Sequence, residues 1–264
     1  MKLLLIGSII LFSFCQNYTA KKTISDIPES SVILDSNAYT IASRYHCPDS
    51  FYRIKYDSAS FQFYLSNLKL KPVGTQVKYF DGSLKSRYAY SSVVDMEISP
   101  VDLQQCADAV MRLRGEYLYH TKQYNKISFR FLGDGKMHTF NEYAAGDKSY
   151  KKFRKYMDYV FSYANTASLH KQLYSKSFYK MEIGDVFIQK GQPYGHAVIV
   201  VDICQNKKGE KKFLLAQSYM PAQETQILLN PNGKGSWYSK PESVKLYTPE
   251  WTFDTSDLRT WSPQ

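Results

Sequence analysis

The last third of the chain most constrains its fold, because it reads as a series of short strands separated by turns. Five segments have the length and apolar content of strands: "GDVFIQK", "GHAVIVVDI", "KKFLLAQSY", "TQILLN" and "VKLYT". Their connections are short and contain glycine, proline or asparagine, which is typical of turns between neighbouring antiparallel strands. The pattern predicts an antiparallel sheet that meanders from residue 184 to residue 248.

Helical patterns precede this sheet. The strongest covers residues 99–120, where apolar side chains recur at three-and-four spacing: Leu103, Cys106, Ala107, Val110, Leu113 and Tyr117. Further helices are expected at 58–68, 149–163 and 166–174, and short strands at 126–132 and 136–143. Asp81-Gly82 predicts a hairpin turn between alternating strands. The expected class is therefore α+β, an antiparallel sheet with helices packed on one face.

Composition limits the function classes. The chain has 264 residues, 44% of them hydrophobic and 22% charged, which is typical of a globular protein. A formal net charge of +10 attracts anions. However, the basic residues are scattered, and no zinc-ligand spacing, RNA-binding aromatic signature or glycine-rich phosphate loop accompanies them. We therefore expect an anionic envelope polymer such as peptidoglycan as partner, or a membrane surface, and no nucleic acid.

The N-terminus predicts export. Lys2 precedes an apolar run from Leu3 to Phe14, which is too short to span a membrane and has the layout of a signal peptide. We assign residues 1–20 to the signal and 21–264 to a single α+β domain. Two processing routes fit: cleavage after Cys15, or lipidation of Cys15 as in bacterial lipoproteins. The expected location is the periplasm, or the outer membrane for an anchored lipoprotein.

Three cysteines remain after Cys15, namely Cys47, Cys106 and Cys204, so at least one thiol should be free. Cys106 lies near the start of the 99–120 helix. If Ser99 and Pro100 open that helix, Cys106 falls in its second turn. If Asp102 caps it, Cys106 falls in the first turn, where the helix dipole favours the thiolate. The alternative is an inert thiol buried in the core.

His196 begins the most apolar strand and shares a face of it with Val198, Val200 and Asp202. Asp202 cannot orient the imidazole, since six residues of strand separate the two by roughly 20 Å. The next strand places Tyr219 roughly opposite His196 and Gln217 on the same face. Gln217 is therefore the candidate hydrogen-bond partner of His196. Its alternative role is that of a sheet-face amide bonded to a nearby loop.

A cysteine on a helix, followed by a Gly-Asp strand and a Gly-His strand, resembles the NlpC/P60 and CHAP cell-wall hydrolases, which are papain-like. The resemblance covers Cys106 and residues 184–219. It implies an NlpC/P60-like core with insertions, in which Cys106 is the nucleophile, His196 the general base and Gln217 the orienting residue. The segment "QQCADAV" lacks the Asp-Cys-Ser/Gly spelling of those families, and Cys106 and His196 lie 90 positions apart.

Most of the mature chain also resembles an uncharacterised bacterial family of secreted proteins and lipoproteins, domain of unknown function 4846. The matching segments are "LQQCADAVMRLRGEYLY", "GDVFI", "GHAVIVVD", "FLLAQSYMPAQE" and "SWY". This resemblance implies export and a cell-envelope setting in a Bacteroidota-type bacterium.

Other candidate residues are few. His46, His120, His138 and His170 show no metal-ligand spacing, so neither a metal nor another cofactor is expected. The amides of Gln104 and Gln105, beside Cys106, are candidates for oxyanion donors. Two functions follow: a secreted cysteine hydrolase acting on peptide or amide bonds, or a non-catalytic envelope protein that binds a glycan, a peptide or a protein partner on the same scaffold.

Overall fold

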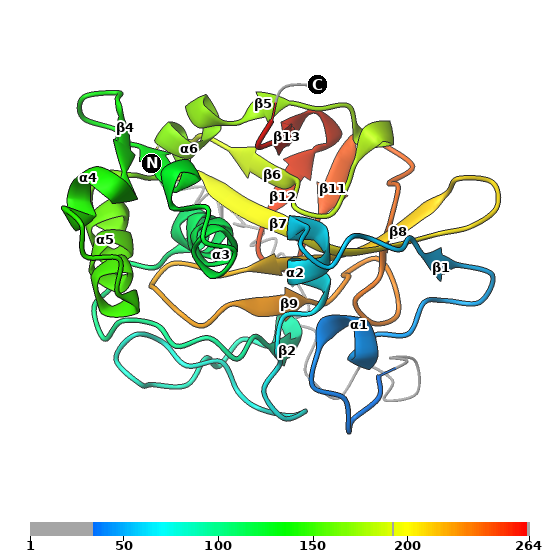
Figure 1. Cartoon of the computed structure of the whole chain (residues 1–264). Coiled ribbons are helices and arrows are strands. Elements are labelled where there is room, and N and C mark those ends of the chain that lie inside the picture. Colours follow the sequence, from blue (N-terminus) through cyan, green and yellow to red (C-terminus); the bar gives the residue numbers. More distant parts are fainter. Residues whose placement is uncertain (1–33, 192, 263–264) are drawn as a thin grey trace, which may run out of the picture. The chain divides into compact units, whose positions relative to one another are not determined.

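A nine-stranded antiparallel sheet forms the centre of the computed structural model, which describes residues 34–191 and 193–262 (Figure 1). Its strands are β1 (Tyr52–Arg53), β2 (Tyr90–Val93), β5 (Tyr174–Ser175), β6 (Val186–Gln189), β7 (His196–Gln205), β8 (Lys211–Gln217), β9 (Gln226–Leu228), β10 (Tyr238–Ser239) and β13 (Leu258–Thr260). The main path runs β2-β9-β8-β7-β6-β13-β5, with β1 paired to β7 and β10 to β8. The described residues form one compact unit. The predicted signal peptide (residues 1–20) and Cys15 lie outside them.

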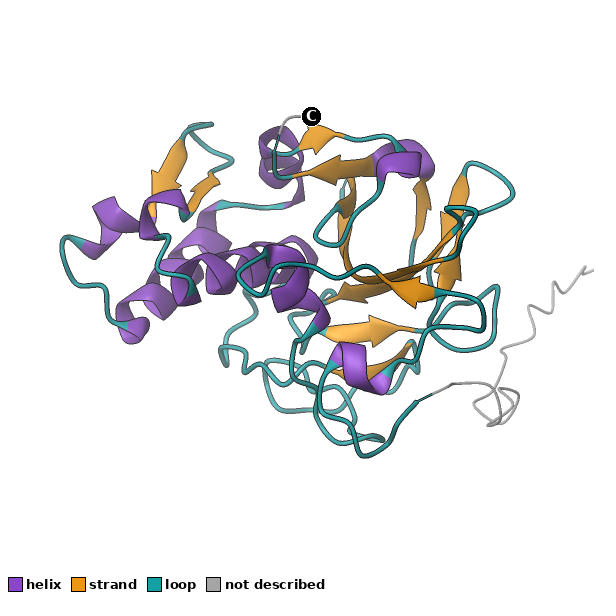
Figure 2. Cartoon of the chain, turned by 45° about the vertical axis from the view of Figure 1, so that its right-hand side comes forward, coloured by secondary structure: helices purple, strands orange, loops and turns teal. Residues whose placement is uncertain are grey.

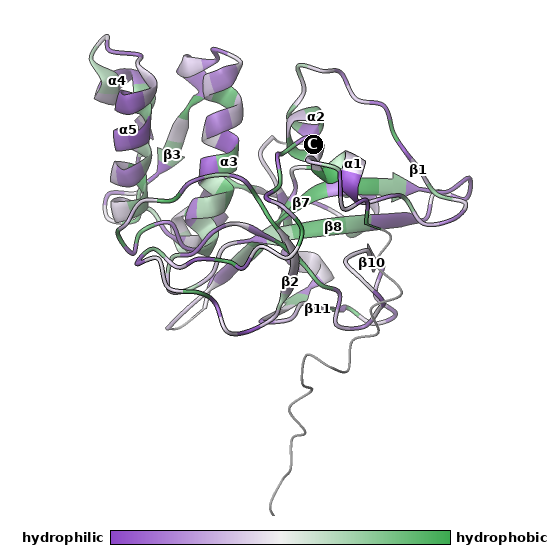
Figure 3. Ribbon diagram, turned by 90° about the horizontal axis from the view of Figure 1, so that it is seen from below, coloured by the Kyte–Doolittle hydropathy of each residue, from purple (hydrophilic) through white to green (hydrophobic). Residues whose placement is uncertain are grey.

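The predicted meander is confirmed from β6 to β9. Val186 pairs with Ile199, Ile199 with Ala216, and Ala216 with Ile227. Figure 3 shows hydrophobic residues along β7 and β8, as expected for strands covered on both faces. The last predicted strand instead joins a separate hairpin, β11 (Lys245–Tyr247) with β12 (Thr252–Asp254). A second small hairpin pairs β3 (Ser128–Arg130) with β4 (Met137–Thr139). The strand predicted at 136–143 is wrong beyond Thr139, because Thr139 caps a short helix there, Phe140–Ala144.

Six helices are present among the described residues. They are α1 (Ile41–Arg44), α2 (Phe61–Ser66), α3 (Cys106–His120), α4 (Phe140–Ala144), α5 (Tyr150–Tyr163) and α6 (Thr166–Gln172). Ser60, Ser149 and Asn165 accept backbone N–H bonds at the starts of α2, α5 and α6, so the three helices predicted around them are confirmed. Three short 3₁₀ turns cover Tyr124–Lys126, Phe178–Lys180 and Thr255–Asp257.

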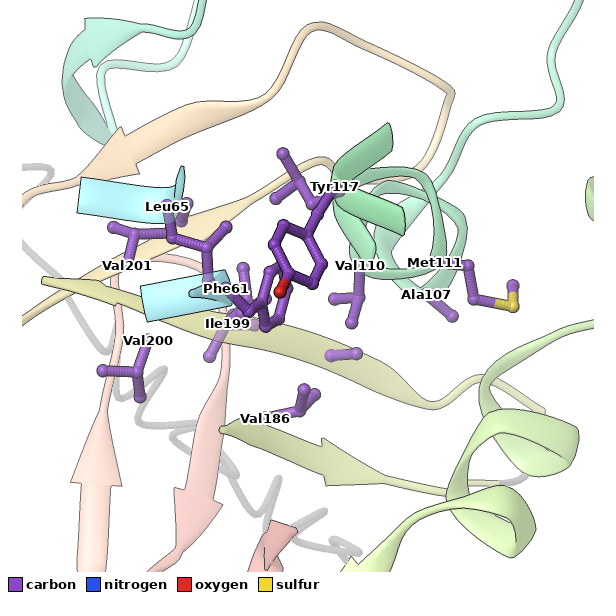
Figure 4. Packing of buried hydrophobic residues seen from close by; sticks show 14 of the residues in the cluster. Phe61, Leu65, Ala107, Val110, Met111, Tyr117, Val186, Ile199, Val200 and Val201 are labelled. Carbon is purple, nitrogen blue, oxygen red and sulfur yellow. The ribbon is translucent and has the colours of Figure 1, made fainter. Parts of the chain in front are cut away.

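Helices and hairpin cover different faces of the sheet. Figure 4 shows Phe61 of α2 and Val110 of α3 meeting Ile199 of β7. On the opposite face the β11–β12 hairpin contributes Phe253, whose ring lies 6.1 Å from that of Phe187 in β6. Figure 2 shows most helical residues gathered on one side of the strands. The α+β class with an antiparallel sheet is confirmed.

Of the hairpin predicted at Asp81-Gly82, the turn is present but the two flanking strands are not. Gly82 adopts φ +85° and the flanking residues form one isolated bridge, Lys78 with Leu84. The following strand, β2, pairs with β9 instead. Tyr90 explains the difference, because its ring is buried and its hydroxyl accepts the Val77 N–H at 2.9 Å, which draws this segment onto the main sheet.

Two of the three cysteines form a disulfide and the third is free, which agrees with the prediction of at least one free thiol. Cys47 and Cys204 form a disulfide with a Cα–Cα distance of 6.0 Å, which ties the N-terminal region to the end of β7. In the described part of the chain Cys106 is the remaining free thiol.

Replacing Gly184 by alanine should destabilise the fold more than the same change at Gly209. Both glycines have positive φ, +97° and +80°, so both variants strain the backbone by about 1 kcal/mol. Only at Gly184 would a Cβ lie 2.9 Å from the buried Phe61 ring, which adds at least about 1 kcal/mol of overpacking. Urea unfolding measures the two losses, and equal values would contradict the close contact.

Candidate active site

Cys106 is the first residue of α3. Gln105 is the N-cap, and its backbone N–H donates to the Asp108 carboxylate at 3.1 Å. Both predicted starts, at Ser99-Pro100 and at Asp102, are therefore wrong, although the first-turn position of Cys106 is confirmed. Asp102 does not cap α3, because its carboxylate accepts the Ala222 backbone N–H at 2.7 Å and the Gln105 side-chain amide at 3.0 Å. These bonds tie the loop before α3 to the segment after β8.

The thiol of Cys106 contacts the strand that carries His196. Its Sγ lies 4.0 Å from the carbonyl oxygen of Gly195 and accepts the backbone N–H of Ala197, the residues on either side of His196. The Thr166 hydroxyl, at the start of α6, lies 3.9 Å away. The residue is 3% exposed. The fold thus brings Cys106 beside the beginning of β7.

Burial decides the ionisation of this thiol. Burial and, to a smaller extent, the nearby Asp108 carboxylate together raise the pKa of Cys106 to about 11. The Ala197 N–H, the Thr166 hydroxyl and the Ala107 N–H lower it but do not compensate. The thiolate expected from the helix dipole is therefore not the resting form, because desolvation outweighs the dipole.

A pocket of about 160 Å³ reaches Cys106 from outside. The first turn of α3 and the first turn of α6 form two of its walls. The loop before β7, including Lys190 and Tyr194, and Met220 from the segment after β8 complete it. The thiol is therefore almost covered, yet it lies at a cavity that a small group can enter.

His196 is fully buried and held by Gln217. Its Nε2 lies 2.8 Å from Gln217 Oε1, so the predicted contact is present. Its ring packs against Tyr219, Trp251 and Phe253, with centroid distances of 5.0, 5.3 and 5.8 Å. Burial lowers the pKa of His196 to about 4, partly opposed by the Gln217 hydrogen bond. The imidazole is therefore neutral at neutral pH.

The orientation of the Gln217 amide follows from its second partner. Its Nε2 donates to Glu250 Oε2 at 2.6 Å, and the same oxygen accepts from Lys85 Nζ at 2.8 Å. With its NH₂ group on the carboxylate, Gln217 presents its oxygen to His196, and this oxygen can only accept. Nε2 of His196 therefore carries the proton, and Nδ1 carries the lone pair. Nδ1 is buried and has no hydrogen-bond partner among the described residues.

Cys106 and His196 lie on opposite sides of the start of β7. Alternation along the strand puts the His196 ring on the face that carries Trp251 and Phe253, whereas α3 packs on the other face. Cys106 Sγ contacts the carbonyl oxygen of Gly195, the residue before His196, and His196 is not among the described residues that line the pocket at Cys106. They make no hydrogen bond to each other within the described residues. Such bonds are often long in a resting site and tighten with substrate.

Several other candidates take structural roles. Asp202 pairs with Arg53 at 2.7 Å. This agrees with the prediction that Asp202 does not orient His196. The Gln105 side-chain amide is bound to Asp102, and Gln104 is 1% exposed with its oxygen on Arg112 at 3.2 Å. Neither side chain is placed as an oxyanion donor, so backbone N–H groups of the first turn of α3 are better placed.

The remaining histidines do not gather with other metal-binding residues. His138 bonds to Asp134 at 2.9 Å, and His120 lies 3.3 Å from Glu116. Within residues 34–191 and 193–262, no group of three or more His, Cys, Asp or Glu side chains could hold a metal ion.

Four residues around the site were not predicted from the sequence: Lys85, Asp108, Glu250 and Trp251. Asp108 has a local signal, because it stands three residues after the N-cap Gln105, the spacing of a capping box. Lys85, Glu250 and Trp251 lie in segments without periodicity, and long-range folding alone brings them to His196.

Replacing Asp108 by asparagine should lower the pKa of the Cys106 thiol, because a negative charge beside it is removed. A fall of about one pKa unit would increase the thiolate fraction at slightly alkaline pH about tenfold. The pH dependence of alkylation by iodoacetamide, followed by mass spectrometry, measures it. Asp102→Asn, on the same loop, is the matched control and should leave the pKa in place. An unchanged profile in Asp108→Asn would contradict the assigned cause.

Comparison with known proteins gives one match. The profile of domain of unknown function 4846 matches residues 41–260, most of the chain. No curated protein and no solved structure matches it. In the part of the chain that the structure describes, no helix has the length and apolar character needed to cross a membrane.

Proposed function

The chain belongs to this family of unknown function, and we propose that it is a secreted cysteine hydrolase that cleaves peptide or amide bonds. Cys106 is the nucleophile, His196 the general base and Gln217 the residue that orients His196. The observation that carries the proposal is the His196–Gln217 hydrogen bond of 2.8 Å, which leaves Nδ1 as an acceptor without a partner among the described residues, while the free thiol of Cys106 contacts the backbone of the preceding residue, Gly195.

The reaction begins from two neutral groups. As Cys106 Sγ bonds to the substrate carbonyl carbon, its proton passes to His196 Nδ1 and the carbonyl electron pair moves to oxygen. The Cys106 backbone N–H, which has no intrahelical partner, can donate to that oxygen. Collapse of the tetrahedral intermediate breaks the C–N bond, and the leaving amine takes the proton from Nδ1. Water then hydrolyses the thioester, returning a proton through Nδ1 to Sγ.

The finer fold and the setting are also proposals. The order of a cysteine helix followed by the β6–β7–β8 meander supports an NlpC/P60-like, papain-like core, in which residues 121–183 are an insertion. The apolar N-terminus and the charge of +10 support export to the cell envelope, attachment through Cys15, and peptidoglycan as the polymer acted on.

The test uses the mature chain with purified peptidoglycan fragments. We expect release of new amino groups, loss of that activity in Cys106→Ala, and a loss of at least about 100-fold in His196→Asn. Ser162→Ala is the control, because Ser162 is an exposed residue of α5 that lines neither the pocket at Cys106 nor the larger pocket described below. Full activity in Cys106→Ala, or no release of amines from any peptide-containing envelope fragment, would reject the hydrolase.

A non-catalytic envelope protein is the second candidate. The nearly covered thiol with a pKa of about 11 favours it, as does a larger pocket of about 630 Å³ lined by Tyr64, Tyr117 and Tyr150. Tyrosine rings suit glycan or peptide binding. If this candidate holds, Cys106→Ala should bind envelope fragments as tightly as the natural chain, and neither should release amines.

A further inference from the structure

We propose that Glu250, paired with Lys85, is a positioning residue that selects the His196 tautomer through the Gln217 amide. Neither residue belongs to the Cys106–His196–Gln217 arrangement. The structural claim stands on the contacts alone, and only its consequence for catalysis rests on the proposed function.

The selection follows from donors and acceptors along one chain of hydrogen bonds. An ionised carboxylate only accepts, so Glu250 Oε2 must receive the Gln217 NH₂ group, 2.6 Å away. The Gln217 oxygen is thereby turned to His196 Nε2 at 2.8 Å. Because that oxygen also only accepts, Nε2 must be the protonated nitrogen. The lone pair is left on Nδ1, the nitrogen that the proposed reaction uses.

Lys85 holds Glu250, the first residue of this hydrogen-bond chain, in place. Its Nζ donates to Glu250 Oε2 at 2.8 Å, and Lys85 and Glu250 are 2% and 4% exposed at their side chains. The remaining donors of Nζ are taken by the side-chain oxygens of Gln223 at 2.9 Å and Gln226 at 3.4 Å. Removing Lys85 would take away the ion pair that holds the Glu250 carboxylate against the Gln217 amide, and Gln217 could then turn over.

The segment that carries Glu250 is itself fixed against His196. Thr248 and Trp251 exchange hydrogen bonds of 2.8 to 3.1 Å, which closes the turn between β11 and β12. The Trp251 indole N–H donates to Gln189 Oε1 at 3.0 Å, and Gln189 is the β6 residue paired with His196. The β11–β12 hairpin, which lies beside β6 in Figure 1, therefore places Trp251 against the His196 ring and Glu250 against Gln217.

Glu250 has a second effect once His196 takes the thiol proton. The imidazolium then donates from both nitrogens, and the Nε2–H bond to Gln217 is retained. The carboxylate charge lies on the far side of the same amide and favours the imidazolium, whereas the positive charge of Lys85 lowers the pKa of His196 and opposes it. Glu250 therefore acts on His196 without direct contact, which leaves the Nδ1 side of the ring free for substrate.

The test measures the tautomer directly by ¹⁵N NMR of the histidine rings, with His196→Asn identifying the signal. We expect the natural chain to show Nε2–H only. The double variant Lys85→Met/Glu250→Met leaves no lone buried charge, and it should show a measurable Nδ1–H population. Glu250→Gln, which retains an oxygen for Gln217 and Lys85, should rescue the Nε2–H form. Lys245→Met, on the same hairpin, is the matched control and should match the natural chain.

An unchanged tautomer in the double variant would overturn the inference. A second readout separates this failure from failure of the proposed function, namely alkylation of Cys106 by iodoacetamide at neutral pH. We expect it to slow about tenfold in the double variant, because fewer molecules hold a base at Nδ1. A shifted tautomer with unchanged alkylation would support the positioning role of Glu250 and count against His196 as the base for Cys106.

Discussion

Replacing Lys85 by methionine should destabilise the protein by about 4 kcal/mol, the cost of leaving one member of a buried ion pair without its partner. The Lys85 and Glu250 side chains are 2% and 4% exposed and lie 2.8 Å apart. Burial already lowers the pKa of Lys85, which shows that the site tolerates its charge only because Glu250 opposes it. Urea unfolding at neutral pH measures the loss.

The double variant Lys85→Met/Glu250→Met should recover most of this stability, since replacing both charges by apolar groups of similar volume is often neutral. The exposed pair Lys245–Asp254 supplies the control, because its members are 47% and 33% exposed. Lys245→Met should cost less than about 1 kcal/mol. If Lys85→Met costs no more than Lys245→Met, the Lys85–Glu250 pair is not buried in solution.

The parts of the site that follow from local patterns were predictable. Gln217 and His196 lie on consecutive strands joined by a tight turn, so alternation and pairing register together place one beside the other. The first-turn position of Cys106 likewise follows from helix patterning, although the residue that caps α3 does not. Consecutive elements with short connections leave few arrangements open.

The remaining parts depend on contacts between distant segments. Lys85 and Glu250 are 165 positions apart and belong to no periodic pattern, so neither could be assigned to His196 in advance. The Cys47–Cys204 disulfide spans 157 positions, and the sequence alone offered three possible pairs among three cysteines. The sequence also left the ionisation of Cys106 open between a thiolate and an inert buried thiol, and burial decides for the protonated form. A helix start is visible in the sequence, whereas the depth of burial is a property of the whole fold.

Two neutral groups at rest distinguish this site from a preformed thiolate–imidazolium pair. Burial raises the pKa of Cys106 to about 11 and lowers that of His196 to about 4, so over most of the pH range neither is charged. In the proposed hydrolase the proton transfer must therefore accompany attack on the substrate. A protonated resting thiol reacts slowly with alkylating agents, and the proposal makes the tautomer of His196 decisive, because only a lone pair on Nδ1 can take the proton.

The same depression of the His196 pKa should make the protein lose stability in acid. The folded state holds a neutral imidazole down to about pH 4, whereas the unfolded chain binds a proton near pH 6.5. Because the unfolded state binds more protons between these values, stability rises with pH there. The contribution of His196 is complete above about pH 6.5 and is lost as the pH falls to about 4. The pKa difference corresponds to about 3 kcal/mol.

Urea unfolding of the natural chain and of His196→Asn, at about pH 7 and about pH 4, isolates this contribution. Burial also raises the pKa values of Asp185 and Asp202, but any contribution of these groups is common to both proteins. The variant should be less stable at neutral pH and should lose about 3 kcal/mol less on acidification. His120→Asn, whose ring is 60% exposed, should keep the natural slope. If the natural chain and His196→Asn lose the same free energy of unfolding on acidification, His196 is solvated in solution. The aromatic rings of Tyr219, Trp251 and Phe253 would then not enclose it.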